Sequence, residues 1–312
     1  MGYGHARHFA VGKMSMHELR LGMIGYGEVG GIFTAALAPQ VAEVRAWDIK
    51  FADPCEAESL RVRAVRGGAN ACPSIAELCA SSDFVICAIT AANVEAVARE
   101  AAAHLRPGTI YLDLNSASPG AKQRAAALVN GAGGNYVEAG VMASVPPHGI
   151  RVPMLLGGPS AAIVAPQLQA WGMNVTVVSD KLGIASAIKM CRSVMIKGLE
   201  ALVVECYSTA RSYGVEEHVL PTLHKTFPSI DWNAQGRYFF SRVVAHGRRR
   251  AEEMREVAVT VCDAGLDPRM TSAIALEQDW VADLAANGAF SDVTEADTWQ
   301  VYADHIIESL HK

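Results

Sequence analysis

The segment Gly25-Tyr26-Gly27-Glu28-Val29-Gly30 has residue types and a spacing that suit phosphate binding. This GxGxxG pattern follows a short apolar run and opens a helical one, which is the context that the pattern requires. The first glycine permits a tight turn, the second lets the backbone approach a pyrophosphate, and the third lets helix and strand pack closely. The amides at the helix N-terminus then face the phosphates. The segment predicts a dinucleotide site, and a glycine-rich turn of another α/β fold is the alternative.

An acidic residue stands where a dinucleotide site needs a ligand for the ribose. Asp48 ends the second expected strand, about 20 residues after the glycines. Its carboxylate can accept hydrogen bonds from both ribose hydroxyls and repels a 2′-phosphate, which favours NAD over NADP. Lys50 could instead hold that phosphate, so NADP stays possible. A solvated strand end is the other alternative for Asp48.

Polar residues also lie at the ends of two further expected strands, at 84–89 and 109–115. Thr90 closes the first, where a Rossmann loop passes over the cofactor, and an ordinary loop is the alternative. Asn115 and Ser116 close the second, at the edge where α/β sheets bind ligands. We expect both to bind substrate and Asn115 also to contact the cofactor, with turn capping as the alternative. Ser144 is a further substrate-binding candidate on the same edge.

The elements that must position these residues form two contrasting halves. In the first half, short apolar runs at 19–24, 41–48, 84–89, 109–115, 136–142, 154–156 and 174–178 are expected strands. Helical stretches are expected at 30–37, 75–80, 91–104, 119–129 and 161–171. Strands that alternate with helices of about 10–15 residues imply βαβ units and a mostly parallel sheet. We therefore predict an α/β Rossmann domain over residues 18–181.

The second half has helical periodicity and no convincing strand. Apolar residues recur at helical spacing from Gly183 to Tyr213, which predicts one helix of about 30 residues stopped by Gly214. Pro221, Pro228 and later glycine-containing turns separate the helices that follow. We therefore predict an all-α domain over residues 182–312.

Composition limits the class of protein. The 312 residues are 51% hydrophobic and 19% charged, which is ordinary for a globular chain of two domains. The net charge of −5 and the absence of a broad basic field give no reason to expect a nucleic-acid partner. No apolar run reaches the ~18 residues of a membrane span. Residues 1–17 are an expected flexible leader without the features of a secretory signal.

The seven cysteines include no CxxC pair, and Cys87 and Cys191 lie in apolar patterns. They are interpreted as buried thiols of a reducing compartment, so a cytoplasmic location is expected. The ten histidines show neither HxxxH nor HExxH spacing, and no metal site is predicted.

Three stretches resemble the β-hydroxyacid dehydrogenase superfamily, in the family's order. Residues 21–27 are similar to the opening strand and glycine turn, and Asp113-Leu114-Asn115-Ser116-Ala117-Ser118-Pro119 is similar to the substrate loop. Lys181-Leu182-Gly183, followed by Lys189-Met190, resembles the stretch that carries the catalytic lysine on a long inter-domain helix. The resemblance covers most of residues 19–213. It implies a nicotinamide-dependent oxidoreductase that forms a homodimer or larger homo-oligomer through its helical domain.

The resemblance makes Lys189 the expected general acid/base. A lysine desolvated between two domains can take a hydroxyl proton and return it in the reverse reaction. A surface lysine is the alternative. Arg192 and Ser193, three and four residues on, share its helix face. We expect Arg192 to hold an anionic substrate and Ser193 to orient the lysine or touch substrate, with an inter-domain salt bridge as the alternative for Arg192. His246 and Arg249 are weaker candidates, for which surface solvation is the better interpretation.

Departures from the family pattern narrow the chemistry. Arg192 and Ser193 replace the usual amide and imidazole groups, and Val141-Met142-Ala143-Ser144 replaces a glycine-rich loop. Ile196 stands where decarboxylating phosphogluconate enzymes carry a glutamate acid, so 6-phosphogluconate is not the expected substrate. The predicted reaction is reversible oxidation of a small 3-hydroxy acid, or reduction of its aldehyde or keto counterpart. An imine reductase on the same scaffold and a non-catalytic NAD(H)-binding redox sensor are the alternatives.

Overall fold

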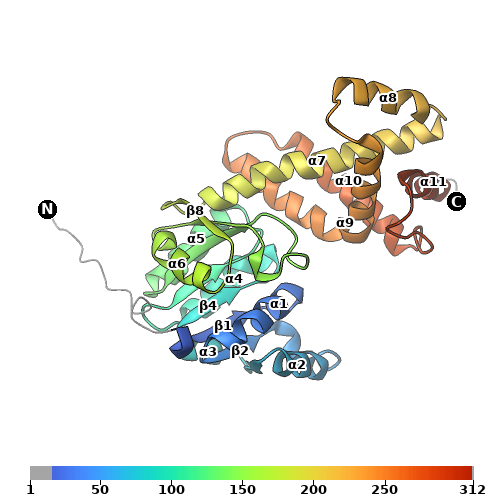
Figure 1. The fold of residues 1–312 in the computed structure, drawn as a ribbon. Coiled ribbons are helices and arrows are strands. Elements are labelled where there is room, and N and C mark those ends of the chain that lie inside the picture. The colour runs from blue at the N-terminus through green and yellow to red at the C-terminus, as the bar shows by residue number, and fades with distance from the viewer. Residues whose placement is uncertain (1–15, 311–312) are drawn as a thin grey trace. The chain divides into compact units, whose positions relative to one another are not determined.

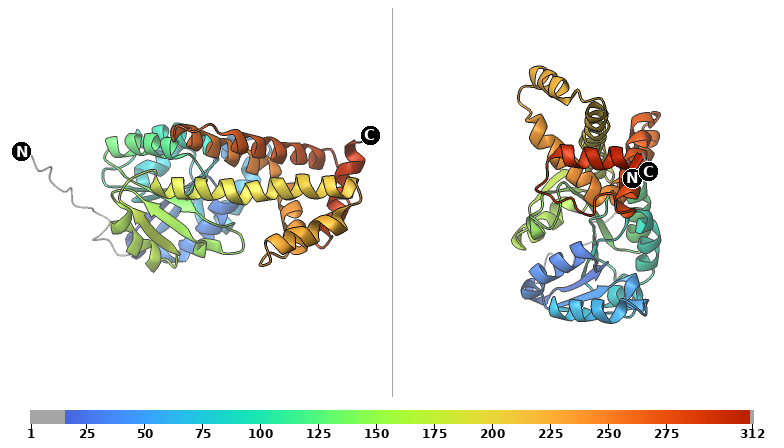
Figure 2. Two further views of the ribbon diagram at one scale, coloured as in Figure 1. Left: turned by 90° about the horizontal axis from the view of Figure 1, so that it is seen from above. Right: turned by 90° about the vertical axis from the view of Figure 1, so that its right-hand side faces the viewer.

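The computed structural model describes residues 16–310, which divide into two compact units, one ending at Lys189 and one beginning at Met190 (Figure 1). Residues 1–15 of the predicted leader lie outside the described residues, and Met16–Glu18 form a short 3-10 helix. The boundary predicted between residues 181 and 182 precedes helix α7 (Ile184–Ser212), and the compact units divide inside that helix. Figures 1 and 2 show α7 as one continuous helix.

The first unit is built on a single eight-stranded sheet of order β3-β2-β1-β4-β5-β6-β7-β8. All neighbouring strands are parallel except β6 and β7. The order from β3 to β6 is that of a Rossmann fold, which confirms the predicted fold class. The strands are β1 (Arg20–Ile24), β2 (Glu43–Trp47), β3 (Ala69–Ala71), β4 (Phe84–Cys87), β5 (Ile110–Asp113), β6 (Asn135–Val141), β7 (Met154–Gly157) and β8 (Val175–Ser179).

Helices cover both faces of this sheet. They are α1 (Glu28–Leu37), α2 (Ala57–Arg66), α3 (Ile75–Ser81), α4 (Val94–Ala102), α5 (Pro119–Gly131) and α6 (Ala161–Ala170). Short 3-10 helices are η3 (Ala38–Gln40), η4 (Ile49–Ala52), η5 (Ala91–Asn93) and η6 (Gly149–Arg151). The sequence patterns missed α2 and β3. Helix α2 buries only Leu60 and Ala64, and β3 has three residues without a β-branched side chain, so neither gives a strong periodic signal.

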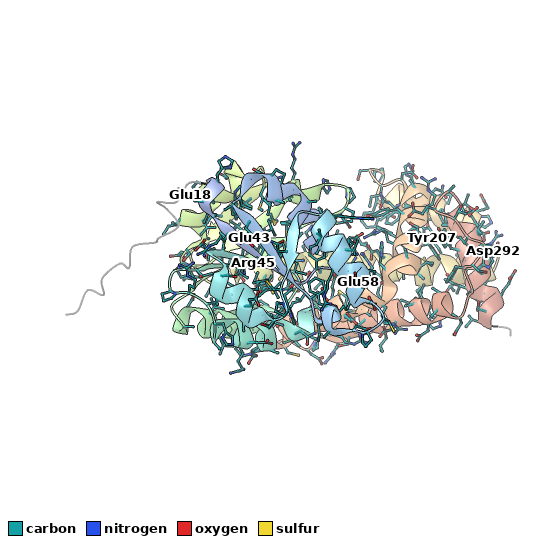
Figure 3. The ribbon with its side chains drawn as sticks, turned by 90° about the horizontal axis from the view of Figure 1, so that it is seen from below. Glu18, Glu43, Arg45, Glu58, Tyr207 and Asp292 are labelled. Atoms are coloured by element: carbon teal, nitrogen blue, oxygen red, sulfur yellow. The ribbon has the colours of Figure 1, made fainter. Side chains whose placement is uncertain are left out.

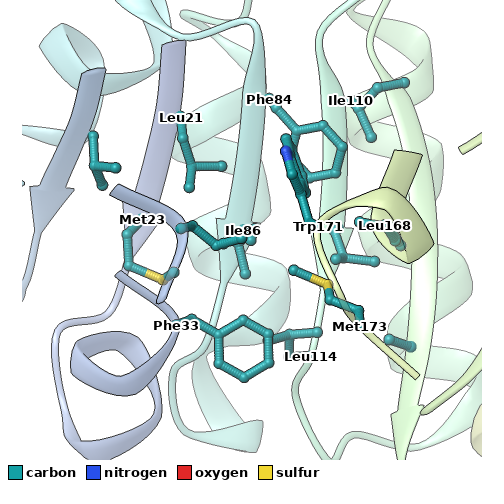
Figure 4. Close-up of a cluster of buried hydrophobic side chains, with 14 of the residues drawn as sticks. Leu21, Met23, Phe33, Phe84, Ile86, Ile110, Leu114, Leu168, Trp171 and Met173 are labelled. Carbon is teal, nitrogen blue, oxygen red and sulfur yellow. The ribbon is translucent and has the colours of Figure 1, made fainter. Parts of the chain in front are cut away.

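Alternating side chains of the strands fill two cores, one on each face of the sheet. On β4, Phe84 and Ile86 pack with Phe33 of α1 and with Trp171, which follows α6 (Figure 4). The alternate residues of β4, Val85 and Cys87, lie on the opposite face in the core formed with α3, α4 and α5. On β2, Glu43 and Arg45 form an ion pair at 3.0 Å on the half-buried side of the strand (Figure 3). This two-residue alternation is the geometry of a strand and explains why the sheet was predictable.

The described residues of the second unit form helices joined by loops, with no strand, as predicted. It contains most of α7, followed by α8 (Glu216–Thr226), α9 (Trp232–Asp263), α10 (Arg269–Ala286) and α11 (Trp299–Leu310). Aromatic side chains dominate its core, where the ring of Tyr207 (labelled in Figure 3) meets that of Trp299 edge-on. The two ring centroids are 4.8 Å apart. Among the described residues, no helix combines the length and the apolar character that crossing a membrane requires.

All seven cysteines are free, but they divide into two groups. Cys72, Cys79 and Cys87 are buried, whereas Cys55, Cys191, Cys206 and Cys262 are exposed. The interpretation of Cys191 as a buried thiol is wrong, because α7 presents that position on its exposed side. Burial raises the pKa of Cys79 and of Cys87 to about 12.

Native protein is therefore expected to react quickly with a thiol reagent at its four exposed cysteines and slowly at the other three. A thiol must be both accessible and deprotonated to react. Burial shields it from the reagent and raises its pKa, which keeps it protonated. Counting reactive thiols before and after denaturation checks this expectation. Fast modification of Cys87 in the folded protein would contradict it.

Candidate functional site

The three glycines of the GxGxxG segment, which connects β1 to α1 and includes the first turn of α1, differ in the space around them. Gly25 has a φ of +89°, and a Cβ added there would lie 2.2 Å from the carbonyl oxygen of Ala88. A Cβ on Gly30 would lie 2.0 Å from the carbonyl oxygen of Gly25. At Gly27 an added Cβ would meet nothing within 4 Å. Gly27 therefore presents a bare backbone on an open surface, which is what close approach of a pyrophosphate needs.

The rest of the predicted cofactor segment lies at the start of α1. Glu28 is the first residue of the helix and is exposed, Val29 is half-buried against the core, and Tyr26 is buried. Burial raises the pKa of Tyr26, and its hydroxyl donates to the carbonyl oxygen of Arg63. Tyr26 and Val29 thus support the turn from inside, while Gly27 and Glu28 lie on its surface.

The Asp48 carboxylate ties the glycine turn to the end of β2. It accepts hydrogen bonds from the backbone amides of Tyr26 at 2.6 Å and Lys50 at 2.9 Å. The ammonium of Lys50, the possible 2′-phosphate ligand, donates to Glu56 at 2.7 Å. Each carboxylate oxygen of Asp48 has further acceptor capacity for a ribose hydroxyl. The arrangement thus fits a dinucleotide at Gly27 and Asp48.

Sequence reasoning missed a cation beside this turn. Arg63 of α2 donates to the carbonyl oxygen of Tyr26 and, at 3.5 Å, to that of Gly27. Its guanidinium also lies over the Tyr26 ring, 5.5 Å from the centroid. Because α2 gives a weak sequence signal and lies far from the glycines in the chain, no local pattern pointed to Arg63.

Asn115 is embedded in a buried polar network behind the carboxyl edge of the sheet. Its Oδ1 accepts from the amide of Ile89 at 2.6 Å, and its Nδ2 donates to Asp113 at 2.6 Å. Asp113 is the centre of the network. It accepts from the Tyr136 hydroxyl and from the fully buried ammonium of Lys122 at 2.9 Å. Asn115 thus joins the loops that follow β4 and β5, and its contact with substrate or cofactor stays a prediction.

Lys189 meets Ser116 at this edge. The ammonium Nζ donates to the Ser116 Oγ at 2.5 Å, and Ser116 directly follows Asn115. Burial raises the pKa of Tyr136 well above its ordinary value, and the adjacent Asp113 carboxylate raises it further. That hydroxyl therefore stays protonated and serves as a donor to Asp113. The buried network fixes the loop, and the loop offers Ser116 to the lysine.

The remaining predicted site residues lie in the loops after β4 and β6 and on helix α7. Thr90 is exposed beyond β4, where its hydroxyl accepts from Asn93 at 2.7 Å. Ser144 is exposed in the loop after β6. In the second unit, Arg192 is exposed, and the Ser193 hydroxyl accepts from Lys197 at 3.4 Å. These roles stay predictions.

The two residues considered as pocket closers lie on α9. Arg249 pairs with Glu253 at 2.6 Å, and His246 lies one turn earlier on the same helix. Within residues 16–310, no three His, Cys, Asp or Glu side chains gather as a metal site would require.

Replacing Gly27 by alanine is expected to weaken NADH binding at least tenfold without loss of stability. The added methyl enters open space in the protein and the volume that the pyrophosphate needs. Gly131→Ala, also in open space but at the end of α5, is the matched control. Fluorescence titration with NADH and thermal unfolding measure the two effects. Unchanged affinity in Gly27→Ala would place the cofactor elsewhere.

Comparison with known proteins agrees with this geometry. The model of the NAD binding domain of 6-phosphogluconate dehydrogenase matches residues 20–179, and a domain of unknown function (DUF1932) matches residues 210–281. A conserved hypothetical protein from Sinorhizobium meliloti is 35% identical, covering 94% of this chain and 97% of its own, with a TM-score of 0.77. The conserved protein MTH1747, whose structure was described as similar to 3-hydroxyacid dehydrogenases, is 32% identical over 86% and 98%, with a TM-score of 0.68.

More distant structures share the fold. A 3-hydroxyisobutyrate dehydrogenase from Mycobacterium tuberculosis is 16% identical, covering 93% and 99% of the two chains, with a TM-score of 0.66. A reductive aminase from Aspergillus terreus, determined with NADPH, is 18% identical over 93% and 99%, with a TM-score of 0.54. The family match covers the glycine turn, Asp48 and the Asp113 loop. The chain therefore belongs to the β-hydroxyacid dehydrogenase superfamily, and its first half is the NAD-binding domain of the 6-phosphogluconate dehydrogenase type.

Proposed function

We propose that this protein transfers hydride between a nicotinamide cofactor and a small anionic 3-hydroxy acid, or its aldehyde or keto counterpart. The observation that carries the proposal is the 2.5 Å hydrogen bond from Lys189 to Ser116. It lies beyond the carboxyl end of β5, and α/β sheets bind their ligands at that edge. A lysine held there is suited to proton transfer beside a bound dinucleotide.

Lys189 performs the proton transfer in this proposal. The nicotinamide, when bound, supplies or accepts the hydride. As a neutral amine Lys189 takes the hydroxyl proton of the alcohol, and as an ammonium it protonates the carbonyl oxygen in the reverse direction. Ser116 accepts one Nζ–H and directs the lysine side chain toward the carboxyl edge of the sheet. Arg192 is the proposed ligand for the substrate's negative charge, since a guanidinium can bind a carboxylate with two hydrogen bonds.

A substrate panel tests the proposal. NADH or NADPH formation is measured with hydroxy acids, sugar acids and plain alcohols, and oxidation of both cofactors with aldehydes, keto acids and ketone–amine mixtures. Turnover of anionic hydroxy acids above uncharged alcohols supports the proposal. Turnover confined to ketone–amine mixtures would instead make the protein an imine reductase. Tight NADH binding without turnover would favour the redox-sensor alternative.

We propose NAD as the preferred cofactor. The Asp48 carboxylate would repel a 2′-phosphate, and the Lys50 ammonium is already paired with Glu56. Wild-type protein is expected to bind NADH at least tenfold more tightly than NADPH, and Asp48→Asn should narrow that ratio. Parallel fluorescence titrations measure both affinities, and thermal unfolding controls for the lost contact to Tyr26. A wild-type preference for NADPH would contradict the proposal, and Arg63→Ala would then test Arg63 as the phosphate ligand.

We also propose a homodimer or larger homo-oligomer through the helical unit, as the resemblance implies. Large apolar side chains lie exposed along α7 and α10, among them Met195, Leu202, Met270 and Leu276. Leu202→Glu should shift the protein toward monomer in sedimentation experiments, since a buried unpaired carboxylate is costly at an apolar interface. A wild-type monomer would refute this proposal and leave the catalytic one standing.

A further inference from the structure

A buried carboxylate holds the beginning of the helix that carries Lys189. Glu138 of β6 is completely buried, and its Oε1 accepts from the amides of Gly183 and Ala185, each at 2.9 Å. Its Oε2 accepts from the Ser186 hydroxyl at 2.9 Å. The first amides of a helix have no acceptor within the helix, and a carboxylate at that end also interacts favourably with the helix dipole. Glu138 therefore provides a cap from a strand rather than from the preceding turn.

The surrounding glycines leave room for this cap. Gly157 is the register partner of Glu138 on β7, and a Cβ there would lie 2.4 Å from the Glu138 Oε1. Gly140 lies two residues further along β6, hence on the same face as Glu138. A Cβ on Gly140 would lie 2.9 Å from the Ala185 carbonyl oxygen and 3.6 Å from the Lys189 Cβ. The first turns of α7 thus lie directly against β6.

Strand register connects the cap to the proposed site. Glu138 pairs in the parallel ladder with Asp113, at the end of β5, and the Asp113 loop presents Ser116. One strand therefore fixes the start of α7, and its neighbour fixes the partner of Lys189. A displacement of α7 along β6 would separate Nζ from Ser116.

We propose that Glu138 is a positioning residue for Lys189, an inference that rests on the proposed function. Its charge and length are both needed, because three donors converge on two oxygens deep in the unit. Neutralising Glu138 weakens the cap and loosens the first turns of α7. Misplacing a catalytic group by about 1 Å can cost about 100-fold in rate.

Glu138→Gln keeps the shape and removes the charge. We expect kcat to fall about 10- to 100-fold while NADH affinity stays within twofold, since Gly27 and Asp48 are untouched. On a Lys189→Ala background, Glu138→Gln should cause no further fall, because residues that act as one unit are non-additive. Ser186→Ala removes one of the three donors to Glu138, so it should lower kcat by a smaller factor. This variant replaces Glu138→Gln in the test if Glu138→Gln does not fold.

Asp83→Asn is the matched control. Asp83 is another shielded carboxylate of the first unit, paired with Arg20 and Arg106 at 2.8 Å directly before β4. Its loss should lower stability and leave kcat unchanged. If Glu138→Gln retains wild-type kcat, or if its effect adds fully to that of Lys189→Ala, the inference is wrong.

A readout independent of turnover separates this inference from the proposed function. Acetylation of lysines at limiting reagent, followed by mass spectrometry, should show Lys189 modified at least threefold faster in Glu138→Gln than in wild type. The exposed Lys181 should react equally in both and is the internal standard. A wild-type protein without turnover refutes the proposed function alone. Equal labelling of Lys189 in both proteins refutes the positioning role.

Discussion

Lys189→Ala is expected to lower kcat by a factor of ~100 or more while NADH binding is retained. General acid/base catalysis by one side chain contributes about 10²- to 10⁴-fold, and this loss falls on the chemical step. The predicted cofactor residues Gly27 and Asp48 lie at the ends of β1 and β2, where Asp48 accepts from the amides of Tyr26 and Lys50. Steady-state kinetics on the best substrate of the panel, together with NADH titration, measure the two parameters separately.

Lys189→Arg distinguishes proton transfer from simple charge attraction. Arginine keeps the positive charge and a comparable length, but its pKa above ~12 prevents it from acting as a base near neutral pH. If Lys189 is the acid/base, the arginine variant should be about as slow as the alanine variant. Substantial activity in Lys189→Arg would show that the residue acts as a fixed cation, and the mechanism would have to be revised.

Local patterns predicted the glycine turn and most of the strands, for a physical reason. Gly25, Gly27 and Gly30 act through their own backbone, so their spacing in the chain already contains the geometry. Burial of β4 on both faces produces a continuous apolar run, which a sequence displays directly. Both signals extend over only a few residues and do not depend on distant partners.

The supporting residues of the candidate site could not be found in this way. Lys122 lies nine residues from Asp113, Tyr136 lies 23 residues from it, and Glu138 lies 45 residues from Gly183. In the sequence Lys122 is indistinguishable from a solvated lysine on a helix. Its burial follows from packing α5 against β5 and β6, which no local period expresses. The sequence pattern therefore identifies Ser116 and Lys189 as candidates, but it does not identify the buried residues that position them.

Helix α7 shows what helical periodicity leaves open. Apolar residues at helical spacing correctly predicted its extent, yet Ile188, Met195 and Leu202 are exposed. Periodicity identifies a helix with an apolar side without identifying what that side contacts. Met195 and Leu202 are among the positions that the proposed homo-oligomer would cover, so their solvent accessibility in solution bears directly on that proposal.

Lys122→Met is expected to destabilise the first unit by about 3–5 kcal/mol. The ammonium is completely buried, and it donates to both the carboxylate and the carbonyl oxygen of Asp113, each at 2.9 Å. Methionine has a similar volume, so the change removes a charge without opening a large cavity. Breaking one half of a buried ion pair leaves an uncompensated charge, which accounts for a cost of about 3–5 kcal/mol.

Lys50→Met is the matched control, because Lys50 forms an ion pair with Glu56 on the surface of the same unit. An exposed pair contributes little to stability, because water and salt screen its charges. Urea denaturation compares the variants, and hydrogen exchange of the β4, β5 and β6 amides assigns the loss to the first unit. Adding Asp113→Asn to Lys122→Met should recover part of the stability, since the remaining buried group is then neutral. If Lys122→Met costs no more than Lys50→Met, the network does not hold the loop, and the positions of Asn115 and Ser116 must depend on the backbone alone.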